Sequence, residues 1–339
     1  MQSRFKQAAL FSVKLLLSIA VLVYIARGLD LQRLRSHLVS VDPLLFVLAL
    51  TLIFFQTFVL NGRWELIMRA LGVSLDWLAG WRILMISLWF NQVLPSSVGG
   101  DAVRMWLLRQ RGVQWPEAVK GVAADRFTAL IGLIALMVAG LPFLISRVSD
   151  QAAILAIGGL TLAGVAGTAV LLTLDRLPKR LTAHPAIASF VRFGALVRFL
   201  LLQSERRALL FGSALLIHLV TAAACFVLAR GVGAQLSVTD AGILIPPVVL
   251  LTAVPISISG WGVREGAMVA CLGLAGVPSE QALSVSLLLG AISVIIGLVG
   301  GAIWLASPER GSYSADKAAK AAEEAPSYDG LGKEVSSHP

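Results

Sequence analysis

PSSVGGDAVR, at residues 95–104, and PISISGWGVR, at residues 255–264, are two versions of one motif. Aligned without a gap, the two segments are identical at five of their ten positions. Each follows an apolar stretch, and its proline and glycines interrupt a helix and leave backbone groups without helical partners. Inside a membrane, such a break is tolerated only where protein or a water-filled cavity covers it. The motif therefore predicts two broken helices that turn back within a lipid bilayer.

The composition indicates a membrane protein. Of the 339 residues, 57% are hydrophobic and 14% are charged, whereas soluble domains carry about 45–50% apolar and about 25% charged residues. The apolar residues gather into runs, most of which approach the ~20 residues that a spanning helix needs. This pattern excludes a soluble enzyme as the first interpretation and predicts an all-α polytopic membrane protein.

We expect about six full transmembrane helices and two re-entrant hairpins, which makes about eight membrane segments. The membrane domain is expected at 1–306 and a disordered tail at 307–339, which is rich in Ala, Ser, Glu, Lys and Gly. The second helix is expected to end at Asn61-Gly62-Arg63-Trp64, where a helix breaker, a cation and an interfacial aromatic coincide. The expected spanning helices lie within 1–26 and at 43–60, 127–145, 152–174, 208–228 and 283–305; the hairpin arms are 78–94 with 102–108, and 243–254 with 267–276.

An offset of 160 residues relates the two motifs and extends beyond them. It carries 43–60 onto 203–220, near one expected spanning helix, and 127–145 onto 287–305, which is the last one. A shared register over this distance indicates an internal repeat. The repeat halves are expected at about 10–146 and 152–305.

Basic loops set the expected orientation in a bacterial-type cytoplasmic membrane. Placing the basic stretches 101–126 and 175–207 in the cytoplasm follows the positive-inside rule and puts both termini there. The first motif then enters from inside and the second from outside, so the halves are inverted. Inverted repeats with interrupted helices point to a transport site near the bilayer midplane. The connection 27–41 would lie outside yet holds three arginines, so it is either an interfacial helix or a place where this topology fails.

The net charge of +9 comes mostly from short loops. We interpret it as positive-inside topology and contact with anionic lipid headgroups, not as nucleic-acid binding. The stretch 186–207 interleaves basic and apolar residues and is expected to lie as a helix on the headgroups. Cys225 and Cys271 lie in apolar stretches, and the four histidines lack ligand spacing; His218 is expected to contact another helix. We therefore predict no metal site and no cofactor.

Charged side chains beside the breaks form the candidate substrate site. An ionised group at the bilayer centre costs at least ~2.5–3.5 kcal/mol, so such groups usually face a cavity and have a partner. We expect Arg104 and Arg264 to hold the phosphate of a lipid headgroup, because a guanidinium can donate two parallel hydrogen bonds to phosphate. The carboxylates are expected to hold the arginines or to exchange partners with the headgroup; they are Asp101, Asp125 and Glu265.

Backbone N–H groups freed at the breaks are expected to add anion-binding donors. The glycines concerned are Gly99, Gly100, Gly260 and Gly262. An alternative stays open, in which the charges only fix the hairpins or anchor a helix end. The groups concerned are the pairs Arg104–Asp101 and Arg264–Glu265 and the dipeptide Asp125-Arg126.

Over roughly residues 10–305, the sequence resembles the lysylphosphatidylglycerol synthase transmembrane-region family of flippase-like membrane proteins, which includes hopanoid-biosynthesis-associated members. The residues that carry the resemblance are Asn91 with Leu94-Pro95, Gly99 to Arg104, Asp125-Arg126 and Pro255 to Glu265. The resemblance implies a protein that moves or helps handle lipids, with aminoacylated phospholipids and isoprenoid-type lipids as substrate classes, and it adds Asn91, Asp125 and Arg126 to the candidate site. The chain ends soon after its last helix, so we expect no soluble aminoacyl-transferase domain and no aminoacyl-lipid synthesis.

These features favour a lipid flippase or transporter, not an enzyme, that moves a phosphate-bearing phospholipid or isoprenoid-linked lipid. One alternative is an accessory or scaffold protein in lipid or hopanoid-type isoprenoid biosynthesis, which would bind lipid-biosynthesis enzymes through 186–207. Another is a membrane transferase, which needs an acid/base pair or a metal-binding acidic cluster. Asp30 and Asp42 are its only weak candidates in the sequence. The oligomeric state stays open.

Overall fold

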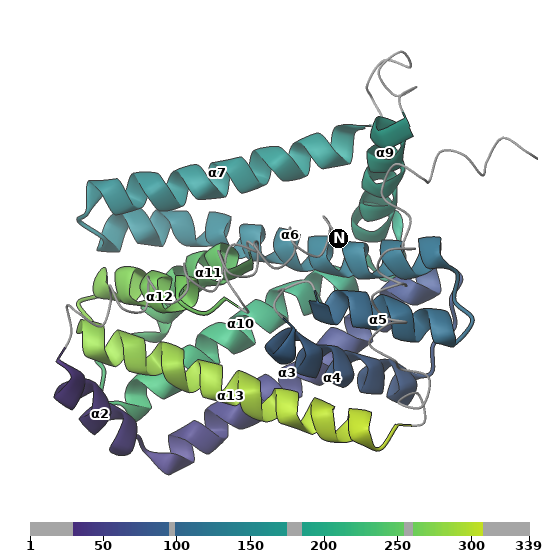
Figure 1. Ribbon diagram of the computed structural model, residues 1–339. Coiled ribbons are helices and arrows are strands. Elements are labelled where there is room, and N and C mark those ends of the chain that lie inside the picture. The colour runs from purple at the N-terminus through teal and green to yellow at the C-terminus, as the bar shows by residue number, and fades with distance from the viewer. Residues whose placement is uncertain (1–29, 95–98, 175–184, 254–259, 308–339) are drawn as a thin grey trace, which may run out of the picture.

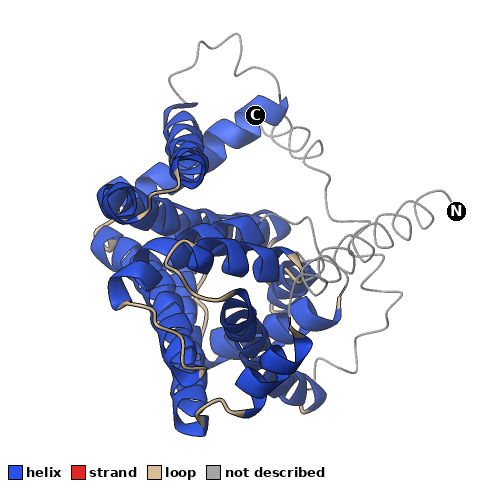
Figure 2. Ribbon diagram, turned by 90° about the vertical axis from the view of Figure 1, so that its left-hand side faces the viewer, coloured by secondary structure: helices blue, strands red, loops and turns tan. Residues whose placement is uncertain are grey.

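The computed structural model describes residues 30–94, 99–174, 185–253 and 260–307. All regular secondary structure in these residues is helical (Figure 2). The first expected spanning helix lies outside the described residues, as does the expected tail apart from Ser307. The elements are α2 (Leu31–Val39), α3 (Pro43–Ala70), α4 (Trp77–Val93), α5 (Gly99–Gln110), α6 (Trp115–Arg147), α7 (Gln151–Thr173), α9 (Pro185–Arg198), the π-helix η2 (Phe199–Gln203), α10 (Arg207–Gly231), α11 (Val238–Ala253), α12 (Val263–Gly273) and α13 (Ser279–Leu305).

Five of these helices are long and apolar enough to cross a membrane: α3, α6, α7, α10 and α13. They include the five spanning helices expected from the sequence within the described residues. The shorter helices α4 and α5 pack against each other, as do α11 and α12, and each pair flanks one of the two motifs (Figure 1). The all-helical membrane architecture predicted from the apolar runs is therefore confirmed.

The element bounds follow the 160-residue offset. Shifted by 160, the bounds of α3, α4, α5 and α6 fall within four residues of those of α10, α11, α12 and α13. The helices therefore recur in the same order and with nearly the same spacing. This recurrence places the two motifs at equivalent points of two four-helix units.

The two units pack into one bundle. α10 lies along α3 and α6, and α13 lies along α4 (Figure 1). Helices of the two units therefore pack directly against each other. The crossing of α13 and α4 is close because Gly300 has no side chain; a Cβ there would collide with the carbonyl oxygen of Met85. α7 packs on α6 at one edge of the bundle and leaves most of its apolar surface uncovered.

The helix end expected at Asn61-Gly62-Arg63-Trp64 is wrong. α3 continues to Ala70, and both Arg63 and Trp64 are buried within it. One glycine does not end a helix whose far end is packed, and the charge of Arg63 is matched by a carboxylate of α6, Asp125.

α6 also differs from the expected helix. It begins at Trp115 and has 33 residues, which makes it about 50 Å long at 1.5 Å per residue. Lys120, which belongs to the basic stretch 101–126 expected as a loop, therefore lies on a helix. Asp125-Arg126 lies about three turns into α6 and not at its start. At the other end of the described chain, the connection 27–41 contains the short helix α2, which packs on α13.

The stretch 186–207 is mostly helical, as expected, and part of its apolar side packs on the protein. Phe193, Val197 and Leu200 are buried in a cluster with Ile67 of α3 and Ala124 of α6. Phe190 and Phe199 are 49% and 42% exposed, so the protein covers only part of the apolar surface of this stretch.

Candidate functional site

A cavity of about 350 Å³ lies where the two units meet, and an arginine from each unit lines it. Arg126 comes from α6 and Arg264 from α12. Asn91 of α4 and Gly260, beside the second break, line the same cavity. The other lining residues are apolar or uncharged: Ile53, Gln56, Gln92, Thr221, Cys225, Ile245, Val248, Val249, Thr252, Met268, Leu289 and Ser293. Four of the predicted site residues are therefore brought together in one cationic cavity.

Arg126 is held in place and still accessible. Its Nε donates to Oδ2 of Asp101 and its Nη2 to Oδ1, both at 2.9 Å, which is a bidentate pair between α6 and α5. The Arg126 side chain is 57% exposed. Because a guanidinium has five N–H donors and this pair uses two, others remain for a ligand in the cavity.

Arg104 lies behind the cavity and does not line it. Its Nη1 donates to Oδ2 of Asp125 at 2.9 Å, and its guanidinium carbon stands 3.6 Å from the ring centroid of Trp64. Nε of Arg63 donates to the other oxygen of Asp125, also at 2.9 Å. All three charged groups of this cluster are buried. Two arginines thus share one carboxylate inside the bundle.

The ion pairs on α5 therefore differ from the pair Arg104–Asp101 that the sequence offered as an alternative. Asp101 pairs with Arg126 and not with Arg104, while Arg104 pairs with Asp125. The reason is that α6 presents an acid and a base at successive positions to α5, so both pairs form between helices. Arg126, and not Arg104, therefore lines the cavity.

Arg264 is fixed from several sides. Its Nη2 and Nε donate to Oε1 of Glu265 at 2.7 and 3.1 Å, and its Nε also donates to Oγ of Ser286 at 3.1 Å. Its guanidinium carbon lies 4.7 Å from the ring centroid of Trp261. A Cβ on Gly290 would lie 2.5 Å from Nη2 of Arg264, so this glycine makes room for the guanidinium. The pair Arg264–Glu265 that the sequence offered as an alternative is present.

Glu265 is fully buried and caps the helix that carries it. Its Oε2 accepts the backbone N–H of Gly262 at 2.5 Å, and Oε1 accepts a hydrogen bond from Oγ of Ser286 at 3.1 Å. Gly260 and Gly262 have φ angles of +82° and +86°, a conformation that glycine adopts without strain. These two glycines lead into α12, whose acidic residue Glu265 is turned back on the helix cap.

Two of the backbone donors expected at the breaks are used within the chain. The N–H of Gly100 donates to Oδ1 of Asn91 at 2.9 Å, and that of Gly262 binds Glu265. Gly99 opens α5 beside Leu94. These two N–H groups are therefore already used. A ligand in the cavity would find its hydrogen-bond donors mainly on side chains.

Sequence reasoning missed several residues of the site. Of these, Arg63 could have been found from the sequence, because a charged residue inside an apolar segment usually has a buried partner or a function. Gln56 and Thr221 line the cavity and bond across α3 and α10 at 3.3 Å. Ser286 reaches both Arg264 and Glu265 from α13. Nothing local in the sequence distinguishes these uncharged residues from packing residues.

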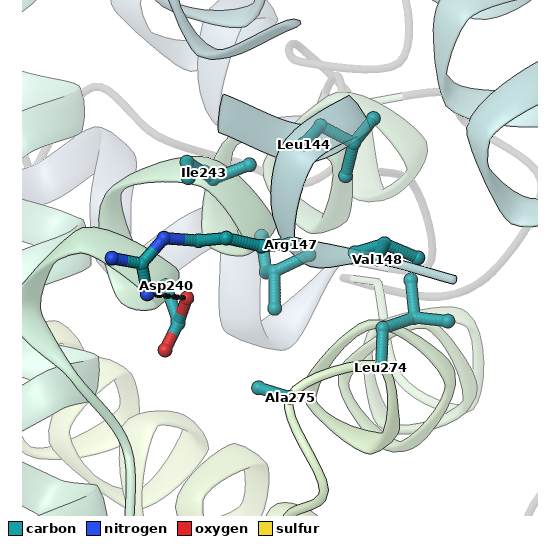
Figure 3. Close-up of a pocket in the computed structure, with 8 residues that line it drawn as sticks. Leu144, Arg147, Val148, Asp240, Ile243, Leu274 and Ala275 are labelled. Carbon is teal, nitrogen blue, oxygen red and sulfur yellow. Dashed lines mark hydrogen bonds and ion pairs between the residues drawn. The ribbon is translucent and has the colours of Figure 1, made fainter. Parts of the chain in front are cut away.

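A second cavity, of about 240 Å³, lies between the end of α6 and the α11–α12 pair. Figure 3 shows the Arg147 side chain extending to Asp240, with Leu144, Val148 and Leu274 on the apolar side. The ion pair has an Nη1–Oδ1 distance of 3.2 Å, and its arginine side chain is 49% exposed. This exposed pair is a contact at the protein surface. Arg147 lies outside the central cavity and can therefore serve as a control for substitutions of Arg126 and Arg264.

The contacts of His218, Cys225 and Cys271 are those of residues that pack helices together. His218 of α10 forms a hydrogen bond between its Nε2 and the backbone oxygen of Ala129 on α6, at 2.9 Å. Cys225 and Cys271 are buried free thiols. Among the described residues, no three His, Cys, Asp or Glu side chains are arranged so that they could hold a metal ion.

Comparison with known proteins identifies the relatives of the chain. The family model described as "Lysylphosphatidylglycerol synthase TM region" matches residues 11–301. A UPF0104 membrane protein of Methanocaldococcus jannaschii is 29% identical over 104 residues, which is 30% of this chain and 30% of that protein. The aligned part thus spans about a third of this curated relative.

Proposed function

The chain belongs to the lysylphosphatidylglycerol synthase transmembrane-region family, and from this premise we propose that it is a lipid transporter of the flippase type. Its cargo is a lipid that bears a phosphate group, which Arg126 and Arg264 bind in the central cavity. The protein works in a bacterial-type cytoplasmic membrane, with both termini in the cytoplasm, the first hairpin entering from inside and the second from outside.

One observation carries this proposal: an arginine from each unit lines the same cavity, beside a broken helix. A phosphate has several oxygens, so guanidinium groups from two sides can bind it together with bidentate geometry. Broken helices at equivalent positions of two repeats are the usual frame of a substrate site in transporters. The uncharged polar lining residues, such as Gln56 and Asn91, supply further hydrogen-bonding groups around a headgroup.

The arginines are suited to binding that can be reversed. Each is paired with a carboxylate in this structure, Arg126 with Asp101 and Arg264 with Glu265. A phosphate must compete with these partners, so it is held less tightly than by an unpaired guanidinium. Moderate affinity favours release, which a transporter needs as much as binding.

We propose transport and not catalysis, because the lining residues identified in the described part of the chain combine two cations with uncharged groups. General acid/base chemistry needs a titratable pair within reach of the substrate. Docking of lipid-biosynthesis enzymes on 186–207 is less favoured, because Phe193 and Val197 are already covered by the chain.

A transbilayer assay tests the proposal. The purified protein is placed in liposomes with fluorescent phospholipids, and dithionite quenching reports their movement between leaflets. The wild type is expected to exceed empty liposomes, and the variant Arg126→Gln/Arg264→Gln to fall to their level with an unchanged elution profile. Arg147→Gln, which removes an arginine outside the cavity, should keep the wild-type rate. Equal rates for the double variant and the wild type would overturn the proposal.

A further inference from the structure

The ion pairs around the central cavity contain more positive than negative charge. Four guanidinium groups belong to this network, those of Arg63, Arg104, Arg126 and Arg264. Three carboxylates pair with them, those of Asp101, Asp125 and Glu265. The network therefore carries one net positive charge.

The excess lies in the cluster where Arg63 and Arg104 share Asp125. Nη1 of Arg63 and both Nε and Nη2 of Arg104 are buried and have no hydrogen-bond partner in the described part of the chain. The side chains of Arg63 and Arg104 are 1% and 3% exposed, so bulk water does not stabilise this charge. A buried charge without a partner is costly, and an anion nearby would reduce that cost.

Among the described residues, the nearby acids have other partners or lie further away. Glu65, two positions after Arg63 on α3, pairs with Arg69. The segments that join the broken helices, 95–98 and 254–259, contain no acidic residue. Glu117 is the nearest other acid on α6, and its buried Oε2 also has no hydrogen-bond partner in the described part of the chain. It lies eight positions before Asp125, which is about 12 Å along the helix. At that distance it compensates far less than a group in direct contact.

The excess charge is positioned to act on a ligand of Arg126. Asp125 and Arg126 are neighbours on α6, and Arg104 interacts electrostatically with both Asp101 and Arg126. An anion bound to Arg126 therefore also experiences the charge of the buried cluster.

Resting on the proposed function, we infer that the cavity selects lipids whose headgroup carries one net negative charge, that is, a phosphodiester with an otherwise uncharged headgroup. Such a lipid neutralises the network. A zwitterionic phospholipid brings its own cation and leaves the excess in place. A phosphomonoester, whose second ionisation falls near neutral pH, introduces a second negative charge and reverses the imbalance.

Binding of three lipids with identical acyl chains tests this inference. Phosphatidylglycerol, phosphatidylcholine and phosphatidic acid at pH 8.5 are titrated into the detergent-solubilised full chain, and native mass spectrometry counts the bound molecules. The wild type is expected to bind phosphatidylglycerol about tenfold more tightly than either of the others, equivalent to about 1.4 kcal/mol. Equal affinities in the wild type would overturn the inference without any variant.

The variant Arg63→Met identifies the source of the preference. It removes the excess charge and leaves Asp125 paired with Arg104, so no carboxylate is left without a partner. The preference for phosphatidylglycerol over phosphatidylcholine is expected to shrink to about twofold, while Arg147→Met keeps the full preference. An unchanged preference in folded Arg63→Met would overturn the inference.

The two proposals fail in different ways. If every lipid binds equally but binding disappears in Arg126→Gln/Arg264→Gln, the charge inference is wrong and the transport site stands. If the double variant binds phosphatidylglycerol as the wild type does, the site itself is wrong.

Discussion

Arg126 on α6 and Arg264 on α12 line one cavity, although 138 positions separate them in the chain. They are not equivalent under the 160-residue offset, which relates Arg264 to Arg104 and Arg126 to Ser286. In each unit, the arginine that follows the break bonds to the next long helix: Arg104 to Asp125 and Arg264 to Ser286. The units therefore share a framework but expose different arginines to the cavity.

This difference has a physical cause. In the first unit, α6 supplies Asp125, and a buried carboxylate draws Arg104 and Arg63 away from the cavity. In the second unit the equivalent of Asp125 is Val285, which cannot do so, and Arg264 stays at the cavity wall beside Glu265. The repeats also differ at the position of Glu265, where the first unit has Met105. Both differences place the carboxylate partner of the arginine on different helices in the two units: on α6 for Arg104 and on α12 for Arg264.

Asp125→Asn is expected to destabilise the protein strongly. The change leaves Arg63 and Arg104 buried without a carboxylate, and removing one partner of a buried ion pair costs about 3–5 kcal/mol. Unfolding of the detergent-solubilised protein, followed by circular dichroism or a thiol-reactive dye, measures the loss.

The matched control is Asp240→Asn, which breaks the accessible pair with Arg147. Exposed pairs contribute about 0–1 kcal/mol, so this variant should unfold nearly as the wild type does. If Asp125→Asn proved as mild as Asp240→Asn, the buried cluster would not exist in the folded protein.

Gly100→Ala is expected to loosen the first hairpin. A Cβ at this position would collide with the carbonyl oxygen of Ser87 and lie 2.5 Å from Oδ1 of Asn91, so α5 would have to move away from α4. Overpacking of this kind costs about 1–3 kcal/mol. Because Asn91 also lines the cavity, lipid binding should weaken together with stability.

Gly212→Ala is the control for Gly100→Ala. It changes glycine to alanine in a helix without adding a steric clash, so it measures the effect of helix propensity alone. Gly212 lies on α10 with open space where a Cβ would point, so alanine should stabilise the helix by up to about 1 kcal/mol. A thermal shift of the same sign for both variants would show that the contact of Gly100 with α4 is not tight.

The sequence predicted the helices well because its signals are local. Apolar runs placed α3, α6, α7, α10 and α13, and the Pro and Gly residues of the two motifs placed the breaks between the shorter helices. The repeat register followed from the same signals, since it needs only the order and spacing of those elements.

The pairing of charges could not be predicted in the same way. Whether Asp101 binds Arg104, one turn away, or Arg126 on another helix depends on how α5 and α6 pack. Arg63 was assigned to a membrane boundary because its partner, Asp125, lies 62 positions away. The lining of the cavity depends on these tertiary contacts, so sequence reasoning named both Arg104 and Arg126 but could not show that only Arg126 lines the cavity.

Asp101→Asn tests whether lipid phosphate competes with the carboxylate for Arg126. Asparagine keeps the shape of the side chain but removes its charge, which frees an arginine whose side chain is 57% exposed. The stability loss is expected to stay below that of Asp125→Asn, because solvent can reach the unpaired guanidinium. Affinity for phosphatidylglycerol should rise about tenfold, since a charged competitor is removed.

The same variant separates binding from transport. With a second excess charge in the network, phosphatidic acid at pH 8.5 should gain more affinity than phosphatidylglycerol, because two negative charges now balance two positive ones. Tighter binding slows release, so dithionite assays should show slower movement between leaflets despite higher occupancy. A fall in affinity for both lipids would mean that Asp101 orients Arg126 for the phosphate and does not compete with it.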